Sequence, residues 1–456
     1  MKIAEDFLPP SQLPIRLFPA DTVALAQLWG NPEHMKNVAR RLRAEYPAEK
    51  LYILVAERNS GSFTYDGIEL GGERVCREIE EKLEEIKSQG GNIKKISIAG
   101  YSLGGLVARY AIGLLYSKGV LDQLECQNFT AFASPFLGVR SPLRGWANQL
   151  FNVLGARTLS KSGHQLFTID SFRDSGRPLL AVMADPKSIF MQGLARFKRR
   201  TLYTNIVNDR TAVYYTTGIS KTDPYADLTK VKVNYVKGYE PVILDPANPV
   251  APLPHEEHKQ DFHTRARAFA SNLPFVLALS VFLPMGVVAL IVTAAIQTVR
   301  SNKRIELHEK GLAGIDIKTY RSVPYIIKEI RTQIEDAYEE LNSSQNQEYL
   351  ASPSRDDSNT TGAKVVDSDD DEEEPTPERE KSRKLSSASQ AAPTLALTEE
   401  QFEMVDGLNG LGWRKYPVWI HKVRHSHAAI IVRMDKPSFS EGGLVLSHWV
   451  KEEFLI

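Results

Sequence analysis

Short apolar runs alternate with amphipathic stretches along the first quarter of the chain. Residues 22–26 and 51–55 are runs of β-branched and aliphatic side chains, which predict buried strands. Between them, Asn31-Pro32 predicts the start of a helix that places three apolar side chains on one face: Met35, Val38 and Leu42. A second helix follows, because apolar side chains recur at helical spacing until Gly90-Gly91: Val75, Ile79, Leu83 and Ile86. Strands that alternate with helices indicate an α/β fold with a mostly parallel sheet and helices on both faces.

The next strand leads into the most informative motif of the chain. The β-type run 95–99 is followed by Gly100-Tyr101-Ser102-Leu103-Gly104, and a helix-type run occupies residues 106–116. Gly-x-Ser-x-Gly between a strand and a helix is typical of a nucleophile elbow, a turn so sharp that the serine is exposed and glycines must keep Cβ atoms out. The motif predicts a serine hydrolase with Ser102 as nucleophile.

Further along, residues 129–133 and 202–207 predict later strands, and the composition then changes. Residues 241–254 are rich in proline and indicate an extended linker. Residues 273–296 contain no charge, and 24 such residues meet the length of a membrane segment. Pro284 and Gly286 interrupt this run at its centre.

The last third alternates between charged and apolar stretches. A helical apolar stripe lies within residues 326–341, for which packing against the protein body is favoured over binding to a membrane surface. Residues 343–398 are rich in Ser, Asp, Glu and Pro and predict a disordered acidic insertion. Core character returns with a strand at 413–420 and a closing helix at 443–454.

These segments define the expected organisation. The hydrolase fold is divided between a main part that carries the elbow and the acid, residues 1–240, and a C-terminal part that carries the catalytic histidine, residues 399–456. Between them lie a linker, an anchor, an amphipathic segment and the insertion: residues 241–272, 273–296, 297–342 and 343–398.

Charge and cysteine content narrow the function classes. The 456 residues include 56 basic and 56 acidic side chains, so no global field favours nucleic acid as a partner. Two cysteines, Cys76 and Cys126, are too few for a disulfide framework, and the first residues lack the pattern of a signal peptide. We therefore expect a reducing, intracellular compartment.

A serine nucleophile needs a histidine to accept its proton and a carboxylate to orient that histidine. In this class of fold the chain order is Ser, acid, His. Asp209 directly follows the predicted strand 202–207, which places it at the carboxyl edge of the sheet as the expected acid; a turn-forming aspartate is the alternative.

Order alone does not select the histidine, because eight of the ten histidines come after Asp209. Three of them cluster after the last strand: His421, His425 and His427. Cysteine and carboxylate partners are absent nearby, so a metal site is disfavoured. No phosphate-binding loop appears, and no cofactor is expected.

Four motifs resemble the serine esterase (lipase-like) family of α/β-hydrolases over roughly residues 21–225. They begin at Leu28-Trp29-Gly30-Asn31-Pro32, Thr64-Tyr65-Asp66-Gly67, Gly100-Tyr101-Ser102 and Asn205-Ile206-Val207-Asn208-Asp209. The segment His427-Ala428-Ala429-Ile430 resembles the family's C-terminal histidine motif. The resemblance implies Ser102 as nucleophile, Asp209 as acid and His427 as base. It also implies similarity to fungal lipases of lipid droplets or the endoplasmic reticulum, which act on glycerophospholipids or monoacylglycerols.

The same resemblance implies an oxyanion hole formed by the backbone N–H groups of Leu103 and Leu28. One departure affects it, because Ala26-Gln27 stand where the family has His-Gly. Three explanations stay open: an impaired hole, a geometry that Gln27 tolerates, or an altered N-terminal sequence. A smaller departure is Ser134-Pro135-Phe136, where many members have a histidine before Leu-Gly.

The apolar run 273–296 must be compatible with a triad. A single crossing would separate Ser102 from His427 by a barrier about 30 Å thick, so we expect a hairpin or in-plane anchor with both flanks in the cytosol. Basic residues flank the run on both sides, which agrees with that topology. A hairpin buried in the hydrolase core is the alternative.

The leading hypothesis is a hydrolase of lipid acyl esters, of phospholipase or monoacylglycerol lipase type. Its expected location is intracellular and membrane-associated, on the cytosolic face of the endoplasmic reticulum or on lipid droplets. The alternatives are a catalytically impaired relative that binds lipid surfaces or serves as a scaffold, and a protein–lipid thioesterase that uses the same triad.

Overall fold

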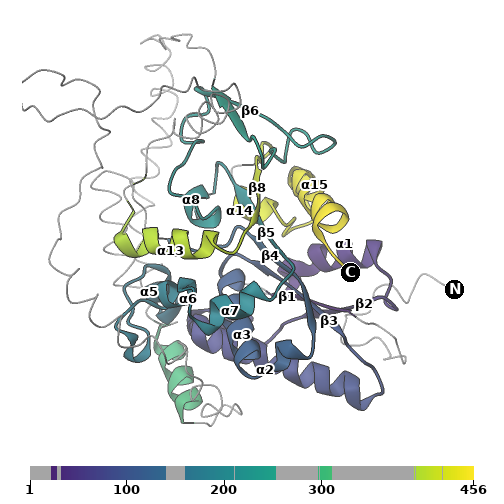
Figure 1. Cartoon of the computed structure of the whole chain (residues 1–456), viewed down its shortest axis with the longest axis vertical. Coiled ribbons are helices and arrows are strands. Elements are labelled where there is room, and N and C mark those ends of the chain that lie inside the picture. Colours follow the sequence, from purple (N-terminus) through teal and green to yellow (C-terminus); the bar gives the residue numbers. More distant parts are fainter. Residues whose placement is uncertain are drawn as a thin grey trace, which may run out of the picture.

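A six-stranded parallel sheet forms the centre of the computed structural model (Figure 1). The structure describes residues 22–27, 32–139, 160–209, 211–252, 296, 298–310, 395, 397–423 and 425–456. The strand order is β2-β1-β3-β4-β5-β8, and every neighbouring pair is parallel. The strands are β1 (Thr22–Gln27), β2 (Leu51–Val55), β3 (Lys95–Tyr101), β4 (Glu125–Phe132), β5 (Arg199–Asn205) and β8 (Arg414–Val418). A separate antiparallel pair consists of β6 (Val231–Val233) and β7 (Val250–Pro252).

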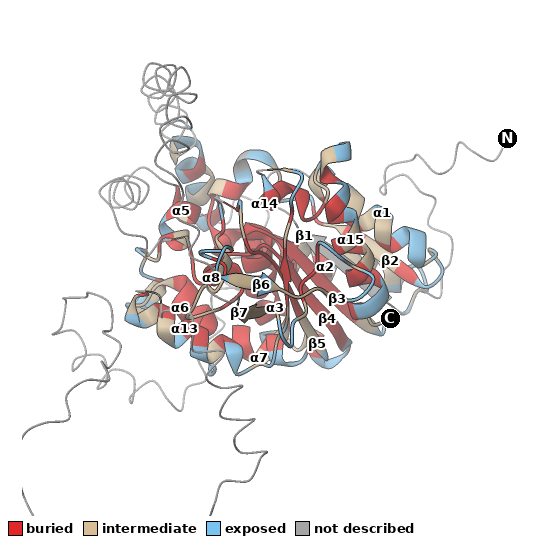
Figure 2. Cartoon of the chain, turned by 90° about the horizontal axis from the view of Figure 1, so that it is seen from above, coloured by how far each residue is buried: buried red, intermediate tan, exposed pale blue. Residues whose placement is uncertain are grey.

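Helices cover both faces of this sheet (Figure 2). One face packs against α2 (Ile68–Ser88), α3 (Leu103–Ser117), α6 (Leu179–Ala184), α7 (Ile189–Ala195) and α13 (Glu399–Asn409). The other packs against α1 (Lys36–Glu45), α14 (Ser426–Ala429), α15 (Ser440–His448) and a π-helical turn, Trp449–Glu453. Two short helices complete the labelled set: α5 (Lys161–Leu166) and α8 (Tyr214–Thr217). Residues 298–309 form a further helix, which carries no label in the figures.

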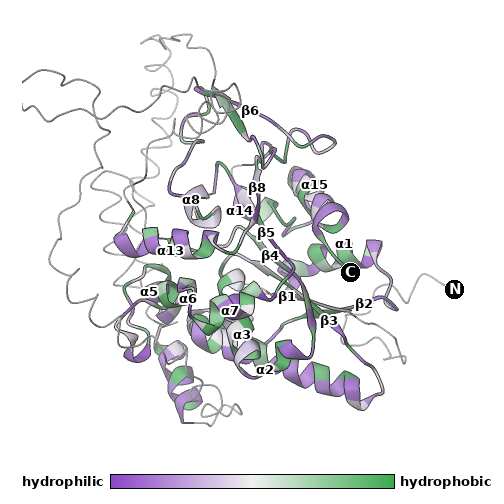
Figure 3. Ribbon diagram, viewed as in Figure 1, coloured by the Kyte–Doolittle hydropathy of each residue, from purple (hydrophilic) through white to green (hydrophobic). Residues whose placement is uncertain are grey.

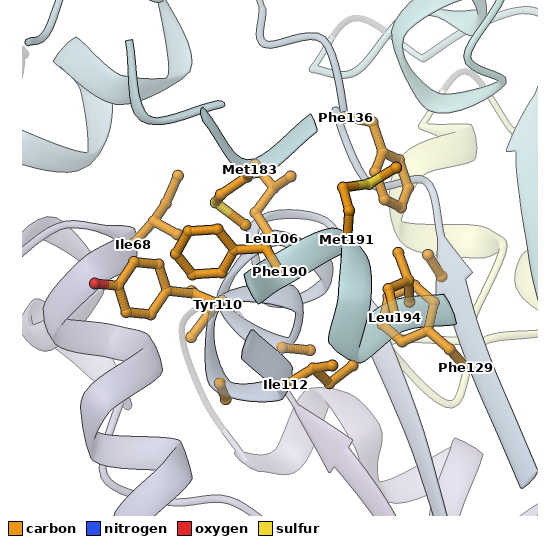
Figure 4. Close-up of a cluster of buried hydrophobic side chains, with 14 of the residues drawn as sticks. Ile68, Leu106, Tyr110, Ile112, Phe129, Phe136, Met183, Phe190, Met191 and Leu194 are labelled. Carbon is orange, nitrogen blue, oxygen red and sulfur yellow. The ribbon is translucent and has the colours of Figure 1, made fainter. Parts of the chain in front are cut away.

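Alternation along the strands explains the two layers. On β3, Ile96 and Ile98 belong to the cluster under α2 and α3, whereas Ala99 and Tyr101 belong to the cluster on the opposite face. Figure 4 shows the first cluster, in which Tyr110 and Phe190 pack with ring centroids 4.9 Å apart. The hydrophilic and hydrophobic residues alternate around α2 and α13, as expected for helices that bury one face (Figure 3).

Local predictions and the observed elements agree closely in the first part of the chain. β2 occupies the predicted residues, and Val75 and Ile79 are buried on α2. The helix expected to begin at Asn31-Pro32 instead starts as a 3₁₀ turn, Pro32–Met35, before α1 begins at Lys36. β5 ends at Asn205, two residues before the predicted end, although Ile206 N still donates to Val418 O at 2.9 Å.

The ends of the predicted linker and insertion contribute to the folded body. Val242, Ile243 and Leu244 are fully buried, and Trp419 N donates to Val242 O beside β8. At the other end, Leu397 is buried against α13, whose first turn carries a capping box between Thr398 and Gln401. Thus residues from the last part of the chain complete the fold: β8 forms an edge of the sheet, and α14 packs on one of its faces.

The predicted anchor, residues 273–296, lies outside the described residues except for Ile296, and most of the acidic insertion 343–398 lies outside them too. Among the helices that the structure describes, none has the length and apolarity needed to cross a membrane. The structure therefore gives the expected anchor hairpin no support.

Candidate active site

Ser102 stands at the turn between β3 and α3. Its backbone has φ 54° and ψ −132°. Residues other than glycine rarely adopt a positive φ, so the surrounding structure must hold Ser102 in this conformation. The constraint includes a hydrogen bond from Ser102 N to Phe132 O at 2.9 Å. The elbow predicts an exposed serine, but Ser102 is only 4% exposed in the structure. It begins the first turn of α3, where backbone N–H groups have no acceptor within the helix.

Two glycines make this turn possible. A Cβ at Gly100 would lie 2.5 Å from Gly105 Cα, and a Cβ at Gly105 would lie 2.1 Å from Ser134 Oγ. Both distances are shorter than any normal contact, so the elbow requires glycine at these positions. Gly105, outside the pentapeptide itself, is as tightly enclosed as the motif glycine Gly100.

Asp209 lies beyond the carboxyl end of β5. Its Oδ1 accepts hydrogen bonds from Thr211 N at 3.0 Å and Ala212 N at 2.8 Å, and its Oδ2 accepts one from Asn205 Nδ2 at 2.9 Å. Three donors therefore hold the carboxylate in one orientation. They also satisfy its oxygens away from water, since Asp209 is only 6% exposed. The preceding residue, Asn208, has φ 62°, a value that asparagine tolerates better than most residues.

His427 lies on α14 and links the other two residues. Its Nδ1 is 2.8 Å from Asp209 Oδ2, and its Nε2 is 2.8 Å from Ser102 Oγ. The structure thus brings together three residues separated by 218 and 325 positions in the sequence. In such a series the imidazole donates from Nδ1 to the carboxylate and accepts the serine proton at Nε2.

The other histidines of the cluster lie elsewhere. His421 stacks on Trp419 with ring centroids 4.6 Å apart, and its Nδ1 is 3.4 Å from Glu441 Oε1. His425 is exposed at the amino end of α14. Only His427 of these three lies against Asp209 and Ser102 in the part of the chain that the structure describes.

Further residues fix the histidine, and the sequence motifs alone did not identify them. Tyr101 Oη donates to the His427 carbonyl oxygen at 2.9 Å, and its ring centroid lies 5.0 Å from that of the imidazole. Burial raises the pKa of the Tyr101 phenol, so this group is neutral and donates throughout the physiological pH range. Ser426 Oγ donates to Val207 O at 2.9 Å, and Asn205 holds the acid. The available signal was their place in the sequence, since Tyr101 and Asn205 lie within motifs and Ser426 directly precedes His427.

The two expected oxyanion donors differ in what the structure describes. Leu103 opens α3, and its side chain is 5% exposed. Leu28 lies outside the described residues, but β1 ends at Gln27, whose register partner on β3 is Gly100. The departure Ala26-Gln27 therefore lies beside the elbow strand, at the sheet edge where Ser102 emerges.

The chain is similar in sequence to a described family and to two yeast proteins. Residues 23–222 match the family described as "Putative serine esterase (DUF676)". The chain is 30% identical to "Putative lipase ROG1" of Saccharomyces cerevisiae over 52% of its own length and 32% of that protein. It is 28% identical to "Putative lipase YDL109C" of the same yeast, over 49% of this chain and 33% of the other.

The chain spans about a third of the length of these curated relatives. Among solved structures, it is similar to "Phospholipase PlaB from Legionella pneumophila in complex with thio-NAD", with 11% identity and a TM-score of 0.27. That likeness covers 43% of this chain and 41% of the other.

Proposed function

Because the chain belongs, over residues 23–222, to the serine esterase family, we propose that it hydrolyses acyl esters of lipids with Ser102, His427 and Asp209. The observation that carries the proposal is the hydrogen-bonded series from Ser102 Oγ through the imidazole to Asp209 Oδ2, with 2.8 Å at each step. The names of the yeast relatives support a lipid ester as the substrate class. The finer fold assignment, an α/β-hydrolase, is part of the same proposal.

The proposed reaction proceeds in two steps. Ser102 Oγ attacks the ester carbonyl carbon while His427 Nε2 accepts the hydroxyl proton, and the same nitrogen then protonates the departing alcohol. Water hydrolyses the resulting acyl-enzyme by the reverse proton transfers. Asp209 keeps the proton on Nδ1 and stabilises the imidazolium that forms.

The oxyanion of each tetrahedral intermediate would be bound by the backbone N–H of Leu103 and, in the expected arrangement, that of Leu28. Loss of one such donor lowers kcat by about 10²–10³-fold in other hydrolases. Ala26-Gln27 replace the family's His-Gly beside the elbow, where the second donor is expected. This departure is the reason for a second candidate function, that of a catalytically impaired relative that binds lipid surfaces.

The substrate type and location complete the proposal. We propose phospholipids or monoacylglycerols as substrates, at the cytosolic face of the endoplasmic reticulum or on lipid droplets. A protein–lipid thioester remains the competing substrate, and parallel assays with both substrate classes separate the two.

Labelling of the purified full-length protein with a fluorophosphonate probe tests the proposal. The expected result is labelling that disappears in Ser102→Ala and persists in Ser97→Ala, a buried serine of β3 that lies away from His427. Wild-type protein that labels no better than Ser102→Ala contradicts the proposal. If labelling then appears in the double variant Ala26→His with Gln27→Gly, the second candidate holds: the protein is a catalytically impaired relative of the family.

A further inference from the structure

The helix 298–309 presents its polar side to the protein body. Ser301 Oγ donates to Asp66 Oδ1 at 2.7 Å, and Arg304 donates to the same carboxylate from Nη2 at 2.7 Å. His308 Nε2 lies 2.7 Å from Glu73 Oε2 on α2. Ser301 and His308 are each 1% exposed, whereas Asp66 and Glu73 are 0% exposed. Positions 301, 304 and 308 lie on one side of a helix, and this side is buried.

The partner cluster is built to receive these groups. Arg74 Nη2 donates to Asp66 Oδ2 at 2.8 Å, so two guanidinium groups share one buried carboxylate. The guanidinium carbons of Arg74 and Arg304 lie 4.9 Å and 5.0 Å from the ring centroid of Phe63. Rotation of the helix about its axis would leave buried charges without these partners, which is strongly unfavourable, so the contacts hold the helix in one orientation.

Of the apolar residues of this helix, only Ile305 lies on the docked side, where it is partly exposed, and the others lie on the opposite side. Ile296 is 48% exposed, Val299 70% and Leu307 42%. Positions 296, 299, 303 and 307 follow helical spacing along one stripe, and exposed Lys303 lies within it. In Figure 1 the helix, drawn in green, lies at the edge of the molecule below α5.

This arrangement inverts the usual amphipathic helix. A helix on a protein in water normally turns its apolar stripe to the core, because burial of apolar surface drives its docking. Here the buried polar contacts to Asp66 and Glu73 fix the reverse orientation, which leaves three large apolar side chains in solvent. This orientation is favourable where the exposed apolar side chains are buried in an apolar partner, such as a lipid layer or another protein surface.

The side chains around the stripe indicate which phase this is. Exposed cationic residues accompany it, namely Arg300, Lys303 and Lys310, with Glu306 paired to Lys310. Long cationic side chains beside an apolar stripe are typical of helices that lie in the headgroup region of a lipid surface. The stripe also continues directly from the uncharged run 273–296 in the sequence.

The loop against which this helix docks begins at the sheet edge from which Ser102 emerges. β1 pairs in parallel with both β2 and β3, so the chain after β2, including Phe63, leaves the sheet at the same edge as the elbow. Phe63 is 40% exposed and contacts Arg304. We propose that Ile296, Val299, Lys303 and Leu307 form a face that binds a phospholipid surface, with exposed Phe63 on the loop against which the helix docks. The choice of lipid as partner rests on the proposed function.

A fluorescent probe at single positions tests this face in the full-length protein. Val299→Cys and Leu307→Cys are labelled with an environment-sensitive fluorophore; both native cysteines, Cys76 and Cys126, are buried and react slowly. Ile456→Cys is the matched control, since Ile456 is 41% exposed and its carbonyl oxygen accepts from Lys95 at the start of β3, the opposite edge of the sheet.

On addition of phosphatidylcholine vesicles that contain phosphatidylserine, we expect a blue shift at positions 299 and 307 and none at 456. Equal responses at the three positions overturn the proposal. A blue shift that depends on protein concentration without vesicles also overturns it, because the face then contacts a second copy of the chain.

Sedimentation with the same vesicles gives an independent measurement. Val299→Asp combined with Leu307→Asp should weaken vesicle binding at least about tenfold, since two apolar side chains no longer enter the lipid. Ile456→Asp should bind as the wild type does. Full binding by the double variant overturns the proposal.

Hydrolysis of a water-soluble short-chain ester distinguishes the two proposals. The double variant should retain it, because no substituted residue touches Ser102, Asp209 or His427. Absent hydrolysis in the wild type counts against the proposed function, whereas the probe response still reports on the lipid-binding face.

Discussion

Each proposed catalytic residue is held by contacts that form only in the folded chain. Ser102 depends on its strained backbone, and His427 on the Tyr101 hydroxyl and ring. Asp209 is held by Asn205 and by two backbone N–H groups of the following turn. The side chains that perform chemistry are therefore separate from those that set their orientation.

Asp209→Asn tests whether the carboxylate sets the histidine tautomer. The amide preserves the shape of the side chain, but its NH₂ group would favour a proton on Nε2 instead of Nδ1 of His427. We expect kcat for ester hydrolysis to fall by about 10⁴-fold with little change in KM. Steady-state kinetics at neutral pH measure this, with circular dichroism as the control for folding; a decrease below tenfold would contradict the role of Asp209.

At the level of elements, the strand–elbow–helix unit depends on close contact with the loop after β4. The clearest point is Gly105, whose missing Cβ leaves room for the Ser134 side chain. The helix α3 then carries Leu106, Val107 and Tyr110 into the core under α2. A change in the turn is therefore transmitted to both the nucleophile and the packing of α3.

Gly105→Ala should destabilise the protein by about 1–3 kcal/mol, because a methyl group enters a filled space. The activity should fall with it, since Ser102 precedes this contact by one turn. The double variant with Ser134→Gly removes both atoms that the new Cβ would meet within 3 Å, so most of the stability should return. Urea unfolding of the two variants measures this; equal losses in both would show that the contact is not the cause.

At the level of the whole molecule, the two ends of the sequence complete one sheet. β1 lies within the sheet near one edge, and β8 forms the other edge after the chain has left the sheet and returned. β8 also carries the partly buried Lys415, whose ammonium donates to Ile219 O at 2.8 Å and Asn409 Oδ1 at 2.7 Å. Burial lowers the pKa of Lys415 from 10.5 to about 8.

This lysine predicts a pH dependence of stability. Between about pH 8 and pH 10 the unfolded chain keeps the proton that the folded chain has lost, so Lys415 makes the free energy of unfolding rise with pH in that window. Lys415→Met should flatten this rise, whereas Lys198→Met, at an exposed surface ion pair, should not. Urea unfolding at several pH values measures the slopes; parallel curves for wild type and Lys415→Met would refute the prediction.

Sequence patterns predicted the local elements because neighbours along the chain determine them. The apolar run of β2, the helical spacing of Val75 and Ile79, and the elbow around Ser102 depend on residues a few positions apart. The predicted strand before Asp209 ends two residues after β5 does. The difference is small because Ile206 N, just beyond β5, still donates a hydrogen bond to Val418 O. Comparison with known proteins confirmed the family resemblance.

What the sequence by itself determined is therefore the order of strands and helices, the elbow serine and the position of an acid after a strand. Chain order leaves eight histidines after Asp209, and the family resemblance alone pointed to His427. Tertiary structure decided how His427 meets the other two residues, because packing of α14 against Tyr101 and Val207 brings it into contact. It also decided which side of the 298–309 helix faces outward. The spacing of apolar residues predicts the opposite orientation, and only the buried carboxylates of Asp66 and Glu73, far away in sequence, reverse it.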